Sequence, residues 1–227
     1  MDPWLSASWS FVRDQLPAAP ATVLEIGCGP RGGFVPELVR GGYHATGVDP
    51  DAPDGPEYER VRFEEYTAPQ SCDVVIACTS LHHVDDLDEV IDRIAEVVVS
   101  DGVVIVIEWV WERFDEATAW WCFERLAPTP PDEEATWLHR HREGWIESGR
   151  SWDGYFTSWV GEHGLHAAAR IVGALDRRFE CRLLRDSPYF FSDLDTTSAA
   201  DEQVAIDAGT IQPNGLRYVG SSRLGGE

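Results

Sequence analysis

Short apolar runs alternate with amphipathic stretches along the first half of the chain. Valine, isoleucine and leucine are dense in four runs, at residues 22–26, 44–48, 73–78 and 103–107. After the third run, apolar residues recur every three or four positions, as in a helix that buries one face: Leu87, Val90, Ile91, Ile94, Val97 and Val98. Apolar strands that alternate with such helices indicate an α/β fold with a mostly parallel sheet, covered by helices on both faces.

The same patterns predict the other elements. These are helices at residues 3–16, 35–40, 165–175 and 202–209, and strands at 60–63, 177–184 (extended by 188–191) and 215–220. We expect Asp2 to cap the first helix, which ends before Pro17, and Asp85 to cap the helix that contains Leu87.

Residues 109–159 break this pattern. They contain eight tryptophans at loose helical spacing, many acids and three prolines. We interpret them as a helical cap inserted into a single domain, whose tryptophans either form a core or line a pocket for a flat organic ligand. The predicted parts of the domain are an N-terminal helix or lid (1–20), a cofactor-binding core (21–109), the cap (110–163) and the C-terminal part of the sheet (164–227).

The charge and the cysteine content limit the kinds of partner that the chain is expected to bind. The 227 residues include 40 acids and 18 basic residues, all of them arginine, which gives a formal net charge of −22. Such a surface repels phosphate backbones and anionic lipids, so we expect no nucleic acid and no membrane as partner. The five scattered cysteines match neither a disulfide framework nor a zinc site. Without a basic leader or a membrane-length apolar segment, the chain is expected to be cytoplasmic.

A glycine turn follows the first apolar run. Residues 27–33 contain Gly27, Gly29, Gly32 and Gly33, directly before the short helix at 35–40. Glycine lets the backbone approach a ligand closely, and the first turn of a helix offers unpaired N–H groups. The turn therefore predicts a site for a nucleotide-like molecule.

Acidic residues follow the next two predicted strands. Asp49, with Pro50, ends the strand at 44–48, where a carboxylate can accept hydrogen bonds from both hydroxyls of a ribose. Glu64 and Glu65 follow the strand at 60–63. They either contact the base of the ligand or form a solvated acidic turn.

Together these residues resemble the class I S-adenosylmethionine-dependent methyltransferases, in particular bacterial members that act on small molecules. The resemblance covers residues 22–109, through the segments 23–29, 48–49, 73–77 and 81–84, and extends to the last helix and strand at 205–220. It implies a Rossmann-like seven-stranded sheet with an antiparallel last strand. It also implies that Glu25 and the backbone of Gly27, Cys28 and Gly29 face the methionine part of S-adenosylmethionine.

Further roles follow from the resemblance. It implies that Asp49 holds the ribose, that Glu64 or Glu65 lies near the adenine, and that residues 78–81 line the methyl donor, through Cys78, Thr79 and Leu81. The implied function is methyl transfer to a small organic acceptor, at oxygen, nitrogen or carbon, within specialised metabolism.

The glycine pattern also satisfies the dinucleotide fingerprint, so a nicotinamide-dependent oxidoreductase is an alternative. Glu25 favours S-adenosylmethionine, because a carboxylate attracts its cationic amino group and repels a pyrophosphate. A non-methylating protein that binds S-adenosylmethionine on the same fold is a second alternative. The sequence leaves the oligomeric state open.

The catalytic candidates are bases that could take a proton from the acceptor. They are His82 and His83 at the fourth strand end, Glu108 at the fifth, and His139 or His141 in the cap. Each also has a plain structural interpretation as a packing, capping or solvated residue. Asp85, Asp86 and Asp88 form a carboxylate cluster, but helix capping explains them, so we predict no metal.

Overall fold

Seven strands and eight α-helices make up the described chain, in a computed structural model that describes residues 3–128 and 135–222. The strands are β1 (Thr22–Ile26), β2 (His44–Val48), β3 (Tyr58–Glu59), β4 (Cys72–Cys78), β5 (Val98–Trp109), β6 (Phe179–Ser187) and β7 (Gly215–Ser222). The helices are α1 (Pro3–Arg13), α2 (Val35–Arg40), α3 (Leu87–Val97), α4 (Glu116–Phe123), α5 (Trp137–Ser148), α6 (Trp152–His163), α7 (Ala168–Arg178) and α8 (Ala199–Asp207).

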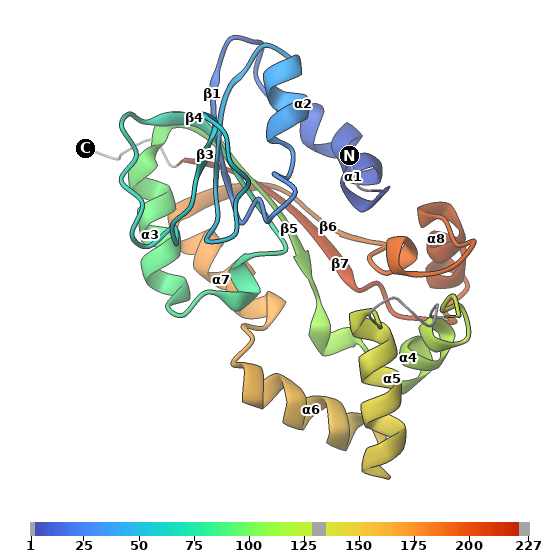
Figure 1. The fold of residues 1–227 in the computed structure, drawn as a ribbon. Helices are drawn as coiled ribbons and strands as arrows, with labels where there is room; N and C mark the ends of the chain where they lie inside the picture. The colour runs from blue at the N-terminus through green and yellow to red at the C-terminus, as the bar shows by residue number, and fades with distance from the viewer. Residues whose placement is uncertain (1–2, 129–134, 223–227) are drawn as a thin grey trace. The chain divides into compact units, whose positions relative to one another are not determined.

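The strands form one sheet in the order β3-β2-β1-β4-β5-β7-β6 (Figure 1). The ladders β3-β2, β2-β1, β1-β4 and β4-β5 are all parallel. The last strand runs antiparallel to them, which confirms the predicted Rossmann-like fold class. In such a sheet, ligands bind beyond the carboxyl ends of the parallel strands, next to the point where the strand order reverses. Here that point lies between β1 and β4.

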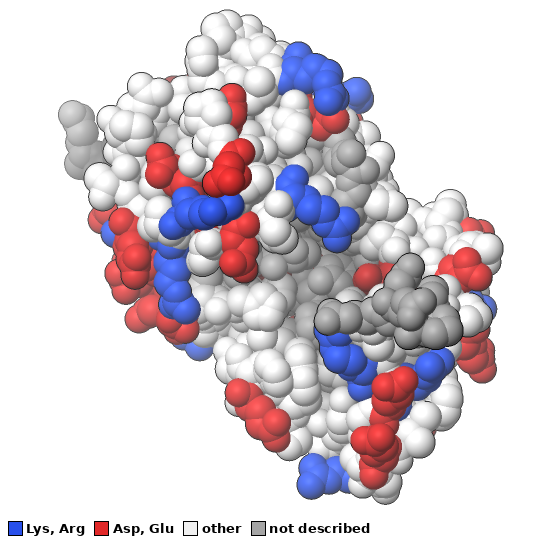
Figure 2. Space-filling view, viewed as in Figure 1, with Lys and Arg blue, Asp and Glu red and all other residues white. Residues whose placement is uncertain are grey.

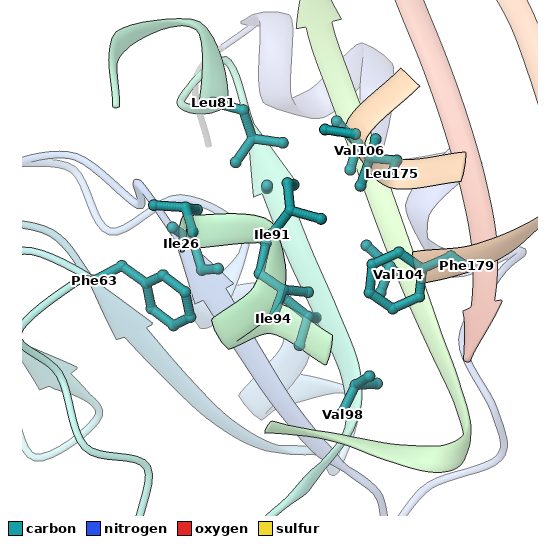
Figure 3. Close-up of a cluster of buried hydrophobic side chains, with 14 of the residues drawn as sticks. Ile26, Phe63, Leu81, Ile91, Ile94, Val98, Val104, Val106, Leu175 and Phe179 are labelled. Atoms are coloured by element: carbon teal, nitrogen blue, oxygen red, sulfur yellow. The ribbon is translucent and has the colours of Figure 1, made fainter. Parts of the chain in front are cut away.

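Alternate residues of the central strands face two separate apolar clusters. Leu24, Val75 and Val104 face one cluster, which α3 and α7 cover. Figure 3 shows its centre, where Ile91 and Ile94 of α3 lie over Ile26 and Val104 of the sheet. The opposite cluster, under α1 and α2, takes the intervening residues Val23, Val74 and Ile105. Burial on both faces explains why these strands are apolar throughout.

The chain divides into two compact units. The first consists of residues 1–108, 166–185 and 216–227, and the second of residues 109–165 and 186–215. The predicted cap, at 110–163, lies within the second unit, which also takes in the segment that carries α8. The finer division at residues 20 and 109 and the role of α1 as a lid stay predictions.

An aromatic core holds the second unit together. Trp109, Trp121, Trp145 and Trp152 are buried in it, and Trp152 donates its indole N–H to the carbonyl of Phe114 at 2.5 Å. Trp111, Trp137 and Trp159 are partly buried against it, whereas Trp120 is 45% exposed. Most tryptophans of this segment therefore serve packing.

Several predicted boundaries need correction. The third strand is Tyr58–Glu59, and residues 60–63 form a bend and turn instead. Asp86, not Asp85, caps α3, because its side chain accepts the N–H groups of Asp88 and Glu89. Val98 starts β5 rather than ending a helix, and residues 100–102 lie within that strand, at a shift in its register with β4. Residues 188–191 do not extend β6. The predicted cap residue Asp2 lies outside the described residues.

The surface of α3 is acidic but locally compensated. Arg177 and Arg178 of α7 pair with Asp88 and Asp92 of α3, and Arg178 holds the pKa of Asp92 below its usual value. Figure 2 shows acidic and basic side chains interspersed over the face of the molecule that is in view. Within the described residues, no helix is long and apolar enough to cross a membrane.

Candidate functional site

The glycine turn after β1 packs closely against the loop that follows β4. Gly27 has a φ of 75°, and a Cβ atom at this position would lie 2.4 Å from the Cβ atom of Ser80. The hydroxyl of Ser80 donates to the carbonyl of Ile26 at 3.2 Å. Gly29 has a φ of 64°, but no heavy atom beyond its own and those of its two chain neighbours lies within 4 Å of where its Cβ would be. Gly27 thus serves a close contact within the protein, and Gly29 borders open space.

Asp49 joins the end of β2 to the same turn. Its Oδ2 accepts the N–H of Gly29 at 3.0 Å, and its Oδ1 accepts the N–H of Asp51 at 2.7 Å. Both oxygens are therefore held at the carboxyl end of the sheet by backbone donors. This is the position at which a carboxylate can reach the hydroxyls of a ribose.

A cavity of about 250 Å³ lies at these strand ends, within the first unit. Residues singled out from the sequence line it: Gly27, Asp49, Pro50, Glu64, Thr79 and His83. The other lining residues are Ile26, Val48, Arg62, Phe63, Ser80, Val84 and Asp85. Glu65 is exposed and is not among the lining residues, so the cavity distinguishes the two candidate glutamates.

Arg62 is a cavity residue that the sequence analysis missed. Its guanidinium group pairs with the carboxylate of Asp85. The sequence pattern placed Arg62 in a predicted strand at 60–63, and a strand position suggests packing rather than a ligand site. A basic residue next to the acidic Glu64 and Glu65 was the signal that could have found it.

Glu25 is buried beneath the turn and does not line the cavity. It is 1% exposed, and both carboxyl oxygens accept the N–H of Phe34, at 2.8 and 3.1 Å. Burial raises the pKa of Glu25 to about 8, although the backbone N–H groups of Phe34 and Val35 oppose the shift. Glu25 thus anchors the chain where α2 begins. Cys28 is also buried, and burial, followed by the charges of Glu25 and Asp49, raises its pKa to about 12.

Glu108 binds the loop that follows β4. It is fully buried at the end of β5, where its Oε1 accepts the N–H groups of Ser80 and Leu81 at 3.0 and 2.7 Å. Its Oε2 lies 2.6 Å from Nδ1 of His82. Because a carboxylate oxygen accepts, Nδ1 of His82 is the donor in this contact.

The two neighbouring histidines have different surroundings. His82 is only 3% exposed, whereas His83 is exposed and lines the cavity. Their rings lie 4.0 Å apart between centroids. Cys78 and Leu81 are buried, and Thr79 has a φ of 50°, which is unusual for a residue other than glycine. The predicted methyl-donor segment therefore contributes Thr79 to the cavity, while Cys78 and Leu81 support it.

His139 and His141 belong to the second unit. The ring of His139 lies 2.7 Å from the hydroxyl of Thr136 and 2.9 Å from the carbonyl of Ala127. Burial lowers the pKa of His141 to about 4, and its Nδ1 lies 3.1 Å from the hydroxyl of Tyr155. Both rings have polar contacts within the second unit, as structural residues would.

The second unit contains a larger cavity, of about 540 Å³. Residues of α4, of the segment 124–126 that follows it, of α8 and of the segment 195–197 line it, among them Trp121, Arg125 and Asp201. It lacks a glycine turn and strand-end carboxylates, so the smaller cavity is the better candidate for a nucleotide-like ligand. Among the residues that the structure describes, no group of three or more His, Cys, Asp or Glu side chains is arranged to hold a metal.

A comparison with models of protein families found one family. A sequence model described as a methyltransferase domain matches residues 7–158. A comparison with curated proteins found no significant match.

Solved structures share the fold at low identity. An S-adenosylmethionine-dependent methyltransferase from Mesorhizobium loti is 17% identical, with a TM-score of 0.58 over 96% of this chain and 99% of that one. The N-methyltransferase NodS from Bradyrhizobium japonicum, in complex with S-adenosyl-L-homocysteine, is 13% identical, with a TM-score of 0.54 over 98% and 89%. A geranyl diphosphate C-methyltransferase from Streptomyces coelicolor is 14% identical, with a TM-score of 0.54 over 96% and 80%.

The family match covers more than half of the chain, and the sheet order, the glycine turn and the cavity with Asp49 are consistent with it. The chain therefore belongs to the methyltransferase domain family, as an S-adenosylmethionine-dependent methyltransferase.

Proposed function

We propose that this enzyme methylates a small organic molecule at oxygen, nitrogen or carbon, in the cytoplasm of a bacterium and within specialised metabolism. The observation that carries the proposal is the 250 Å³ cavity, which brings Gly27, Asp49, Glu64 and Thr79 together at the carboxyl ends of the strands. The net charge of −22 supports a small acceptor, because it opposes the approach of nucleic acid.

The residues of this cavity fit S-adenosylmethionine. Asp49 presents two carboxylate oxygens for the ribose hydroxyls, and Phe63 and Glu64 offer an apolar surface and a hydrogen-bond acceptor for the adenine. Pro50 and Thr79 complete the wall. When bound there, the cofactor supplies an electrophilic methyl group on a sulfonium that is already a good leaving group.

Glu25 lies against Gly33 of the glycine turn, next to the cavity but not among its lining residues. Its carboxyl group is held under the glycine turn with a pKa raised to about 8 by burial. A cationic amino group near it would favour the ionised form, as opposite charges do. We assign the methionine part of the cofactor to this end of the site, along the backbone of Gly27, Cys28 and Gly29.

For the protein side of the reaction, we assign proton removal from the acceptor to His83. Its exposed ring lines the cavity, whereas His82 is buried with Nδ1 directed at Glu108. Histidine is suited to this work near neutral pH. Glu108 and His82 then serve to position the loop, and His139 remains a further candidate, in the second unit.

We assign the choice of acceptor to the second unit. Its partly buried rings, including Trp111, Trp137 and Trp159, provide aromatic surface of the kind that binds flat or apolar molecules. The S. coelicolor relative acts on geranyl diphosphate, and NodS is an N-methyltransferase, so proteins of this fold reach different acceptors.

The test is a methyl-transfer screen with S-adenosylmethionine carrying a labelled methyl group. The purified enzyme is offered small phenols, amines and enolisable carbonyl compounds, and, in separate reactions, total RNA and unfolded protein. We expect label on a small molecule only, and less than a tenth of that rate with His83→Ala, because general-base catalysis typically contributes about 10²–10⁴-fold. Label on RNA or protein alone would overturn the proposed acceptor class.

A further inference from the structure

The loop after β4 supplies much of the cavity wall. Thr79, Ser80, His83, Val84 and Asp85 all line the cavity. This loop, residues 79–85, has little regular structure, apart from one turn of 3₁₀-helix at Leu81–His83. Its position therefore depends on groups outside it that bind its backbone.

Glu108 binds one part of this loop. It accepts the N–H groups of Ser80 and Leu81, and the ring of His82 lies within hydrogen-bond distance of its second oxygen. Three donors on one fully buried carboxylate fix the first half of the loop against the end of β5.

His166 binds the second half. Its backbone N–H donates to the carbonyl of His82 at 3.0 Å, and its Nε2 lies 2.9 Å from the carbonyl of Val84. Nδ1 of the same ring lies 3.2 Å from a guanidinium nitrogen of Arg170, which can only donate. Nε2 is therefore the donor in a hydrogen bond to the carbonyl oxygen of Val84. His166 is 8% exposed, so water competes little for these bonds.

Glu108 and His166 occupy special places in the chain. The chain passes from one unit to the other after residues 108, 165, 185 and 215. Glu108 is the last residue before the first passage, and His166 is the first residue after the second. Their neighbours Trp109 and Leu165 are both buried in the aromatic core of the second unit.

We propose that Glu108 and His166 are positioning residues that together fix the 79–85 loop and couple it to the second unit. A displacement of Trp109 or Leu165 within the aromatic core is passed, one peptide bond away, to a residue that binds the loop. By thermodynamic linkage, occupation of the cofactor cavity must then change the second unit in return. This inference rests on the proposed cofactor site.

The first test measures binding of S-adenosyl-L-homocysteine by calorimetry. We expect His166→Ala to weaken binding about tenfold, since it removes one buried hydrogen bond from the loop, and His166→Gln, which can still donate to Val84, to stay within about threefold of wild type. His44→Ala is the control, because His44 is an exposed histidine of the same unit at the start of β2. Equal affinity of His166→Ala and wild type would overturn the positioning role.

The second test needs no variant and is independent of whether His166→Ala folds. Hydrogen exchange of the wild type is followed by mass spectrometry with and without saturating S-adenosyl-L-homocysteine. We expect slower exchange at 79–85 and also at 109–114 and 160–165 in the second unit. Protection at 79–85 alone would overturn the coupling and leave the cofactor site intact. No binding at all would overturn the proposed cofactor site, and the inference with it.

Discussion

Among the residues that the structure describes, three buried glutamates bind backbone N–H groups. Glu25 accepts from Phe34, Glu108 from Ser80 and Leu81, and Glu202 from Tyr189 and Phe191. A buried carboxylate is costly unless hydrogen bonds compensate it, and each of these holds a loop that lacks a strand or helix partner. Sequence patterns did not reveal this role, because an acid within or after an apolar strand equally suggests a ligand site.

Glu25 makes stability depend on pH. Its pKa of about 8 lies well above the value of 4.5 for an exposed glutamate, so the folded state keeps a proton that the unfolded state releases. This stabilisation is complete below pH 4.5 and is lost as the pH rises towards 8. We expect Glu25→Gln, which cannot ionise, to gain stability relative to wild type by about 1.4 kcal/mol per pH unit across this window, and to gain nothing more above it.

Urea unfolding of both proteins at several pH values checks this expectation. The difference between the two free energies of unfolding is the relevant quantity, since other groups titrate in both proteins alike. A difference that stays constant from pH 5 to pH 8 would contradict this expectation, because it would show that Glu25 is ionised in the folded protein over this whole range.

At the scale of elements, the prediction succeeded where the residue pattern was long and regular. The helical spacing of Leu87, Val90, Ile91 and Ile94 places these residues in α3, and all four are buried on the sheet. The prediction of the third strand was wrong because β3 has only two residues, Tyr58 and Glu59, which are too few to show a pattern. The strand is set by its pairing with Gly47 and Val48 instead.

The cofactor cavity was predictable in part for the same reason. Gly27 and Asp49 follow regular strands, whose parallel pairing brings their ends together. Arg62 and Ser80 lie in loops, and their positions depend on the partners Asp85 and Ile26, which no local pattern reveals. The second unit also takes in residues 186–215, a distant segment that contributes Tyr189 and Phe190 to the aromatic core.

A substitution at Gly27 tests the close packing of the glycine turn on the loop after β4. Gly27→Ala incurs both the strain of a positive φ and the contact of its Cβ with Ser80, at 2.4 Å. Gly164→Ala is the matched control, with a φ of 62° and no atom within 4 Å of the added Cβ. We expect a loss of about 1 kcal/mol for the control and roughly 1–3 kcal/mol more for Gly27→Ala. Thermal or urea unfolding measures both; equal losses would contradict the close packing of the turn on the loop.

The whole chain combines a unit that contains the cofactor cavity with a unit that has an aromatic core. The first contains the parallel sheet, the glycine turn and the cavity, and the second contains the tryptophan-rich core. The charge of −22 is spread over a surface whose arginines pair locally with acids, as along α3. Cofactor binding can be measured before the acceptor is known, and this arrangement requires it.

The most direct test is calorimetric titration of the wild type with S-adenosyl-L-homocysteine, and of Asp49→Ala and Asp51→Ala in parallel. Asp49 lines the cavity, whereas the exposed Asp51 in the same turn does not. We predict one site per chain in the wild type, affinity weakened at least about tenfold in Asp49→Ala, unchanged affinity in Asp51→Ala, and no heat with reduced nicotinamide dinucleotide. Absence of binding to the wild type, or full affinity in Asp49→Ala, would contradict the account.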